Sequence, residues 1–274
     1  MTTIEIIFPK WIMKLKAKVP TEWNELSAKQ LISVAGLLYS GTEDLYKFRI
    51  ELLRILIGLK WHHLLSIGSE RLIDLYPFVQ FIESEIRLTQ NKIQYLKLQG
   101  KRYFGPIGDF STLTGEEWTE ADECFIEFHS SGDVAELDKM MAILFRERIK
   151  GISPKSENWA NDYREPFSEA RVTNRIPVMA KVPLTVKMAV LLWWKGCRRE
   201  WEEVFERVFK SKGEGPQSFG WQETLLKLSG SEFGDLKSTQ ATPMYKLMLK
   251  MEVALKDEEY RKEQEDARKR SHVY

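Results

Sequence analysis

The hydrophobic residues between positions 186 and 208 recur every three or four residues, which is the spacing of one face of an α-helix. Pro183 stands at or near the start of this segment, where the first helical turn tolerates a residue without an N–H group. The pattern predicts a long amphipathic helix with its apolar stripe toward the protein core. The stripe consists of Val186, Val190, Trp193, Cys197, Trp201, Val204 and Val208.

Capping signals predict helices elsewhere in the chain. Ser27 and Gln30 have the spacing of a capping box, so we expect a helix from there to about Tyr39. Asp133 and Glu136 form a similar start after Gly132, and the helices before and after this glycine should pack as an antiparallel hairpin. Further helices are expected in residues 42–59, in residues 70–87 with a break at Pro77, and in residues 221–229 and 242–256.

The stretch LTGEEWTEADECFIEF at 113–128 is rich in carboxylates. Thr114 and Glu117 have capping-box spacing, and acidic residues in a first turn are favoured by the helix dipole. Glu116 and Glu120 lie off the apolar stripe, where water solvates them, whereas acid–base catalysis needs a perturbed, buried group. We therefore interpret the stretch as a helix start rather than a catalytic cluster. Its apolar stripe is Trp118, Ala121, Phe125 and Phe128.

Two segments have β-strand patterns. IEIIF at residues 4–8 ends before Pro9 and favours a short edge strand. IQYLKLQGKRYF at residues 93–104 has Gly100 between two short runs and predicts a small β-hairpin. We expect a mainly α protein, built as a helical bundle or as helical hairpins, with this small β-hairpin.

The pattern divides the chain into four parts. Residues 1–150 form an N-terminal mainly helical domain, and residues 151–182 form a loosely structured, proline-containing connecting segment. Residues 183–256 form a C-terminal helical region, and residues 257–274 form a charged tail with almost no apolar stripe. Whether the two halves are independent domains is left open.

The charge balance argues against a nucleic-acid or membrane partner. Lys and Arg number 41 against 40 Asp and Glu, so no global basic field exists. The apolar run at 188–194 is far shorter than the roughly 20 residues of a membrane span. Cys124 and Cys197 fall on or beside apolar helix faces, which favours a reducing compartment, and no signal-peptide pattern precedes Pro20. We expect a cytoplasmic protein.

No constellation for catalysis, cofactor binding or metal binding is evident. His62 and His63 are adjacent and diverge by about 100° on a helix, unlike the i,i+4 pair that binds zinc. Cys124 and His129 are five residues apart and diverge likewise. The glycine-containing segment 210–220 lacks the order of a phosphate loop. We expect a non-enzymatic protein without cofactors, and a helical enzyme is the less favoured alternative.

Five residues are candidates for partner binding. Trp194 lies about 100° off the long helix's apolar stripe, so it either faces a partner or covers a loop of its own chain. In the last helix, flexible methionines could adapt to an apolar client, although the same residues would also suit a core helix. The candidates are Trp194, Met244, Met248, Met251 and Leu255.

Several segments together resemble the tail-assembly chaperones of bacteriophages and prophages. They are VPTEWNEL at 19–26, YFGP at 103–106, LTGEEW at 113–118, LDKMMAILFR at 137–146 and FGDL at 233–236. The resemblance implies a helical, non-enzymatic protein of the host-cell cytoplasm that binds other phage tail proteins, above all the tape-measure protein. The alternative is a structural component of a phage or phage-like particle, a tail or connector protein retained in the virion. Self-association as a homo-oligomer is left open.

Overall fold

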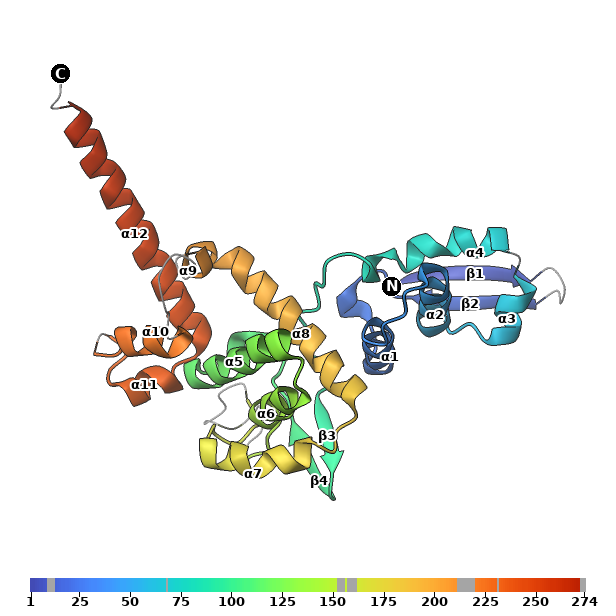
Figure 1. The fold of residues 1–274 in the computed structure, drawn as a ribbon, viewed down its shortest axis with the longest axis horizontal. Helices are drawn as coiled ribbons and strands as arrows, with labels where there is room; N and C mark the ends of the chain where they lie inside the picture. Colours follow the sequence, from blue (N-terminus) through green and yellow to red (C-terminus); the bar gives the residue numbers. More distant parts are fainter. Residues whose placement is uncertain are drawn as a thin grey trace.

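The computed structural model describes residues 1–8, 13–67, 69–151, 156, 162–210, 220–230 and 232–271. The protein is mainly α, as predicted, and the described β structure consists of two small antiparallel sheets of two strands each. The N-terminal hairpin and the last helix lie at opposite ends of the molecule (Figure 1). Among the described residues, no helix is both long enough and apolar enough to cross a membrane.

The N-terminal part combines a β-hairpin with four helices. β1 (Thr2–Phe8) contains the predicted edge strand and pairs with β2 (Met13–Val19), from Thr2 opposite Val19 to Phe8 opposite Met13. The predicted capping box is confirmed, because Ser27 Oγ accepts the backbone N–H of Gln30 at the start of α1. The helices are α1 (Ala28–Leu38), α2 (Leu45–Ile57), α3 (Trp61–Ser66) and α4 (Ser69–Leu75).

The α-helical structure is interrupted around Pro77, as predicted. α4 gives way to two short 3-10 turns, η2 (Tyr76–Phe78) and η3 (Gln80–Ile82), instead of a second α-helix. The predicted β-hairpin follows as β3 (Tyr95–Leu98) and β4 (Lys101–Phe104). Its two turn residues have φ angles of 50° and 76°, a conformation that Gly100 adopts without strain.

The predicted helical hairpin is present. α5 (Gly115–Ser131) ends at Gly132, which has a left-handed φ of 73°, and α6 (Val134–Leu144) starts with the Asp133 side chain accepting the N–H of Ala135. The two helices pack against each other. A short 3-10 turn, η4 (Phe110–Thr112), precedes them.

The prediction of a loosely structured segment at 151–182 is wrong for its second half. α7 (Glu169–Met179) packs on α6, and the Arg175 guanidinium donates to the Ala142 carbonyl at 3.0 Å. A buried arginine and Pro177 near the helix end disrupt the apolar periodicity, which is why the sequence pattern did not reveal the helix.

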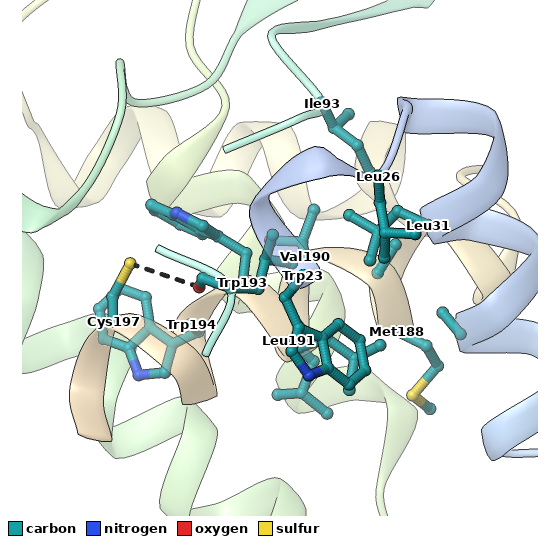
Figure 2. Packing of buried hydrophobic residues seen from close by; sticks show 14 of the residues in the cluster. Trp23, Leu26, Leu31, Ile93, Met188, Val190, Leu191, Trp193, Trp194 and Cys197 are labelled. Carbon is teal, nitrogen blue, oxygen red and sulfur yellow. Dashed lines mark hydrogen bonds between the residues drawn. The ribbon is translucent and has the colours of Figure 1, made fainter. Parts of the chain in front are cut away.

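The long helix α8 (Leu184–Val204) connects the two halves of the chain. It starts after Pro183 and packs on α1 as well as on α6. Figure 2 shows the cluster in which Trp23, Leu26 and Leu31 of the N-terminal part gather beside this helix. Val204, predicted to face inward, is the last residue of the helix and is 55% exposed, whereas Val208 of the same predicted stripe is buried.

The C-terminal part begins with α9 (Glu206–Lys210), after which residues 211–219, most of the predicted glycine-containing linker, lie outside the described residues. α10 (Gly220–Leu228) and α11 (Leu236–Ala241) then lead into α12 (Met244–Ser271). The charged tail thus continues α12 through residue 271. The helix extends away from the body of the protein (Figure 1).

Candidate protein-binding surface on the C-terminal helix

The root of α12 is joined to the start of α5 by backbone hydrogen bonds. The N–H of Met244 donates to the carbonyl of Leu113 at 2.8 Å, and the N–H of Gly115 donates to the carbonyl of Thr242 at 2.9 Å. The LTGEEW stretch is therefore both a helix start and the anchor of a distant helix. These bonds fix the direction in which α12 leaves the core.

One face of the helix root is packed into the protein. Met244, Leu247 and Met248 have no exposed surface. The packing requires a glycine on α5, because a Cβ atom on Gly115 would lie 2.9 Å from Leu247 Cδ1 and 3.0 Å from Leu225 Cδ2. This face is a core face.

The predicted partner-binding face is corrected by this burial. Met244 and Met248 are wholly enclosed and cannot meet a partner in this conformation. Met251 and Leu255 are only partly buried, because they lie where the helix leaves the core, and they remain accessible along one side. The residues that the sequence pattern selected on this helix therefore lie mainly on its buried face.

A second apolar line on α12 faces solvent, and we refer to it as the outer stripe. It consists of Tyr245, Leu249, Val253 and Tyr260, with exposed fractions of 43%, 47%, 48% and 61%. Spacings of four, four and seven residues keep these side chains on one side of a helix with about 100° per residue. Single exposed apolar residues are ordinary, whereas Tyr245, Leu249 and Val253 form a line over two successive turns, with Tyr260 two turns further along and Lys256 between them.

Arg207 holds the lower part of α12 against α9. Its guanidinium contacts Glu252 Oε1 at 2.9 Å and Glu259 Oε2 at 2.7 Å. Glu252 also accepts the backbone N–H groups of Arg207 and Val208 at 3.1 and 3.2 Å. The carboxylates of Glu259 and Glu252 raise the pKa of Arg207 above its usual range. From Lys256 to Arg270 every side chain of α12 is solvent-exposed, whereas the preceding root, Met244 to Leu255, has one buried and one exposed side.

Trp194 is not a surface residue, which corrects its proposed role in partner binding. It has no exposed surface, and its ring centroid lies 4.3 Å from that of Phe110. Its indole N–H points to Asp122 Oδ1 at 3.4 Å. The other reading of the sequence, that Trp194 covers a segment of its own chain, is the one the structure supports.

Two acids of the 113–128 stretch are buried, contrary to the expectation of a solvated cluster. Asp122 has no exposed surface and accepts from Trp221 Nε1 at 3.0 Å and from Arg198 Nε at 2.8 Å. The sequence does contain a signal for the burial of Asp122. This residue is four positions after Trp118 and three before Phe125, so it lies on the apolar stripe of the helix. It joins α5, α8 and α10.

Glu117 forms a second buried charge network. Its carboxylate lies 2.6 Å from Arg146 and 3.1 Å from Arg164, and Arg164 also contacts Asp162 at 2.7 Å. Burial lowers the pKa of Arg146 to about 10. Thr114 Oγ1 accepts the N–H of Glu117 at 3.3 Å, so the predicted N-cap is confirmed, but the Glu117 side chain serves the arginines instead of the cap.

The two cysteines of the chain are also buried. Burial raises the pKa of the Cys124 thiol to about 12 and that of Cys197 well above its usual value, which keeps both thiols protonated. Within the described part of the chain, no group of three His, Cys, Asp or Glu side chains could hold a metal ion. His272 falls outside that part.

An acidic pocket of about 390 Å³ lies between α5, α10 and α11. Its carboxylates include Glu116, Glu120 and Glu169, and Glu120 is paired with Lys139 at 3.1 Å. Burial, followed by the negative charge of Glu169, raises the pKa of Glu116. The expectation that water keeps Glu116 unperturbed is therefore wrong.

The chain matches no protein-family model, and comparisons with curated proteins and with solved structures also give no match.

Proposed function

We propose that this is a non-enzymatic phage assembly protein, similar to a tail-assembly chaperone, that binds a long helical client such as the tape-measure protein in the host-cell cytoplasm. The observation that carries the proposal is the outer stripe on α12. A folded core holds this helix by its other face, so the stripe stays available while the root remains fixed.

The stripe has the chemistry of a helix-binding surface. Tyr245, Leu249 and Val253 span two helical turns, which is the length over which an amphipathic client helix would place its own i, i+4 and i+7 residues. Tyrosines contribute apolar area and a hydrogen-bonding hydroxyl, which is typical of interface centres. Lys246 is exposed beside the stripe and can contact acidic residues of a client, whereas Lys250 is paired with Glu232 at 3.1 Å.

Pre-organisation supports the proposal. The rings of Tyr245 and Phe205 lie 5.5 Å apart, and those of Tyr245 and Trp201 lie 6.2 Å apart, so the first residue of the stripe is held by aromatic neighbours while 43% of its surface stays exposed. A surface ordered before binding loses less conformational entropy when the client docks.

Co-expression with the tape-measure protein of the same phage or prophage genome tests the proposal. We expect the client to stay soluble and to co-purify with the wild-type protein. The matched variant is Leu249→Asp, and the control is Glu127→Ala, whose exposed side chain lies on α5. No association with the wild-type protein, or equal association with Leu249→Asp, would contradict the proposal.

The same experiment separates a chaperone from the alternative, a structural component of a phage or phage-like particle. Mass spectrometry of mature particles would find the protein only if it is retained. We expect it in complexes with the client before tail completion and not in finished particles.

A further inference from the structure

The exposed part of α12 carries its charges in blocks of alternating sign. Residues 257–259 are acidic, residues 261–262 are basic, residues 265–266 are acidic and residues 268–270 are basic. This part of the helix projects beyond the body of the protein (Figure 1). Glu258 and Lys262 pair within the helix at 2.7 Å.

These blocks are complementary to themselves when the helix is reversed. In an antiparallel pair centred between Glu263 and Gln264, each charge of residues 257–270 except Glu263 has an opposite charge at its own height on the other helix, although not all of these charges lie on the side that faces the other helix. The matched residues are Asp257 with Arg270, Glu258 with Lys269, Glu259 with Arg268, Arg261 with Asp266 and Lys262 with Glu265. A parallel pair in register would instead place like charges together, so the pattern favours the antiparallel arrangement.

A line of weakly polar residues marks the face that would form the contact. Tyr260, Gln264 and Ala267 follow at spacings of four and three, and they continue the outer stripe along the helix. Tyr260 is 61% exposed and would lie at the height of Ala267 of the other helix, a large side chain against a small one.

Charged residues lie on both sides of this line, and four of them face an opposite charge on the other helix. Asp257 and Arg268 lie on one side of it, and Glu259 and Arg270 lie on the other, at about 100° per residue. In an antiparallel pair, side chains on the same flank of the two helices face each other. Each of these acids is then within two residues' height of the base that faces it. Two like-charge approaches oppose these pairs, because Glu263 faces Glu263 of the other helix and Arg261 lies within two residues' height of Arg268. The Glu258–Lys262 pair points to the opposite side of the helix.

We infer that a second copy of this chain binds along residues 257–270 of α12, antiparallel to the first, and forms a homodimer. Two short helices bury less surface than a standard interface, so the dimer is weak and dynamic. The overlap leaves Leu249 uncovered, about 43 Å along the axis from its counterpart at a rise of 1.5 Å per residue. The dimer would cover Tyr260 but display Tyr245, Leu249 and Val253 of both outer stripes at its ends, and the inference stands independently of client binding.

Sedimentation equilibrium of the full-length protein tests this inference. We expect a concentration-dependent dimer that dissociates about tenfold more readily when salt rises from about 0.1 M to about 1 M, since the Debye length falls from about 10 Å to about 3 Å. A wild-type protein that stays monomeric at low salt at all accessible concentrations would overturn the inference.

Charge reversal distinguishes specific pairing from a loss of helix. One variant carries Arg268→Glu, Lys269→Glu and Arg270→Glu, and the other carries Asp257→Lys, Glu258→Lys and Glu259→Lys. Each alone should be monomeric, because acid then meets acid or base meets base. Mixed in equal amounts, they should form a heterodimer. Failure of the mixture to associate, with both cores folded by circular dichroism, would overturn the antiparallel model.

Discussion

The indole of Trp221 on α10 donates a 3.0 Å hydrogen bond to Asp122 Oδ2 on α5, joining residues that are 99 positions apart. Asp122 also pairs with Arg198 at 2.8 Å. Removing this carboxylate takes an acceptor from three buried or partly buried donors, Trp221, Arg198 and Trp194. We expect Asp122→Ala to lower the free energy of unfolding by about 3 kcal/mol, measured by urea denaturation.

The control for this change is Glu127→Ala, an exposed glutamate on the same helix, which should alter stability by less than about 0.5 kcal/mol. If Asp122→Ala changed the free energy of unfolding as little as Glu127→Ala does, the hydrogen bonds of Asp122 would not be what joins the three helices.

Gly196 provides a second test, this time of the close approach between α8 and the chain before β3. A Cβ atom at this position would lie 2.3 Å from the Leu88 carbonyl oxygen and 2.7 Å from its nitrogen. Alanine favours a helix over glycine by about 1 kcal/mol, so without the contact Gly196→Ala would stabilise the protein. We expect a loss of about 1 to 3 kcal/mol from overpacking instead.

Thermal unfolding of Gly196→Ala beside Lys195→Ala, its exposed neighbour, measures this effect. A higher melting temperature for Gly196→Ala than for the wild type would mean that the segment around Leu88 does not lie against α8.

The acidic pocket predicts a pH dependence of stability. Burial and the charge of Glu169 raise the pKa of Glu116, so the folded protein holds this proton more tightly than the unfolded chain does. The stability that the bound proton of Glu116 adds to the folded state is therefore complete below the unfolded pKa of about 4.3. It is lost as the pH rises through the raised pKa of the folded state. Glu116→Gln should stabilise the protein more at neutral pH than at pH values near about 4.

Unfolding free energies of Glu116→Gln and wild type across this pH range provide the measurement. Glu127→Gln, on the exposed side of α5, serves as the reference. A benefit of Glu116→Gln that is equal at all pH values would show that the carboxyl group is not perturbed by its surroundings.

Local signals in the sequence predicted the local features of this fold. The Ser27 cap, the Thr114 cap and the turn at Gly100 each depend on residues within a few positions of one another. The mainly α class follows from the same short-range periodicity. These features could be predicted because the responsible contacts are short in sequence.

The faces of α12 could not be assigned in the same way, because both are apolar. Met248 and Leu249 are adjacent and comparably hydrophobic, yet the first has no exposed surface and the second is 47% exposed. Which side is buried depends on contacts with distant parts of the chain, such as the close approach of Leu247 to Gly115, more than a hundred residues earlier. The burial of Glu117 likewise depends on arginines that are distant in sequence.

The central claim, that the outer stripe binds a helical client, is tested most directly by comparing Leu249→Asp with Met248→Asp. Purified wild type and each variant would be measured for affinity to the tape-measure protein and for thermal unfolding. We expect Leu249→Asp to keep the wild-type melting temperature and to lose binding by at least about tenfold, roughly 1.4 kcal/mol, whereas Met248→Asp unfolds the helix root by burying a charge. Leu249→Asp that is folded and binds the client as tightly as wild type would contradict the claim.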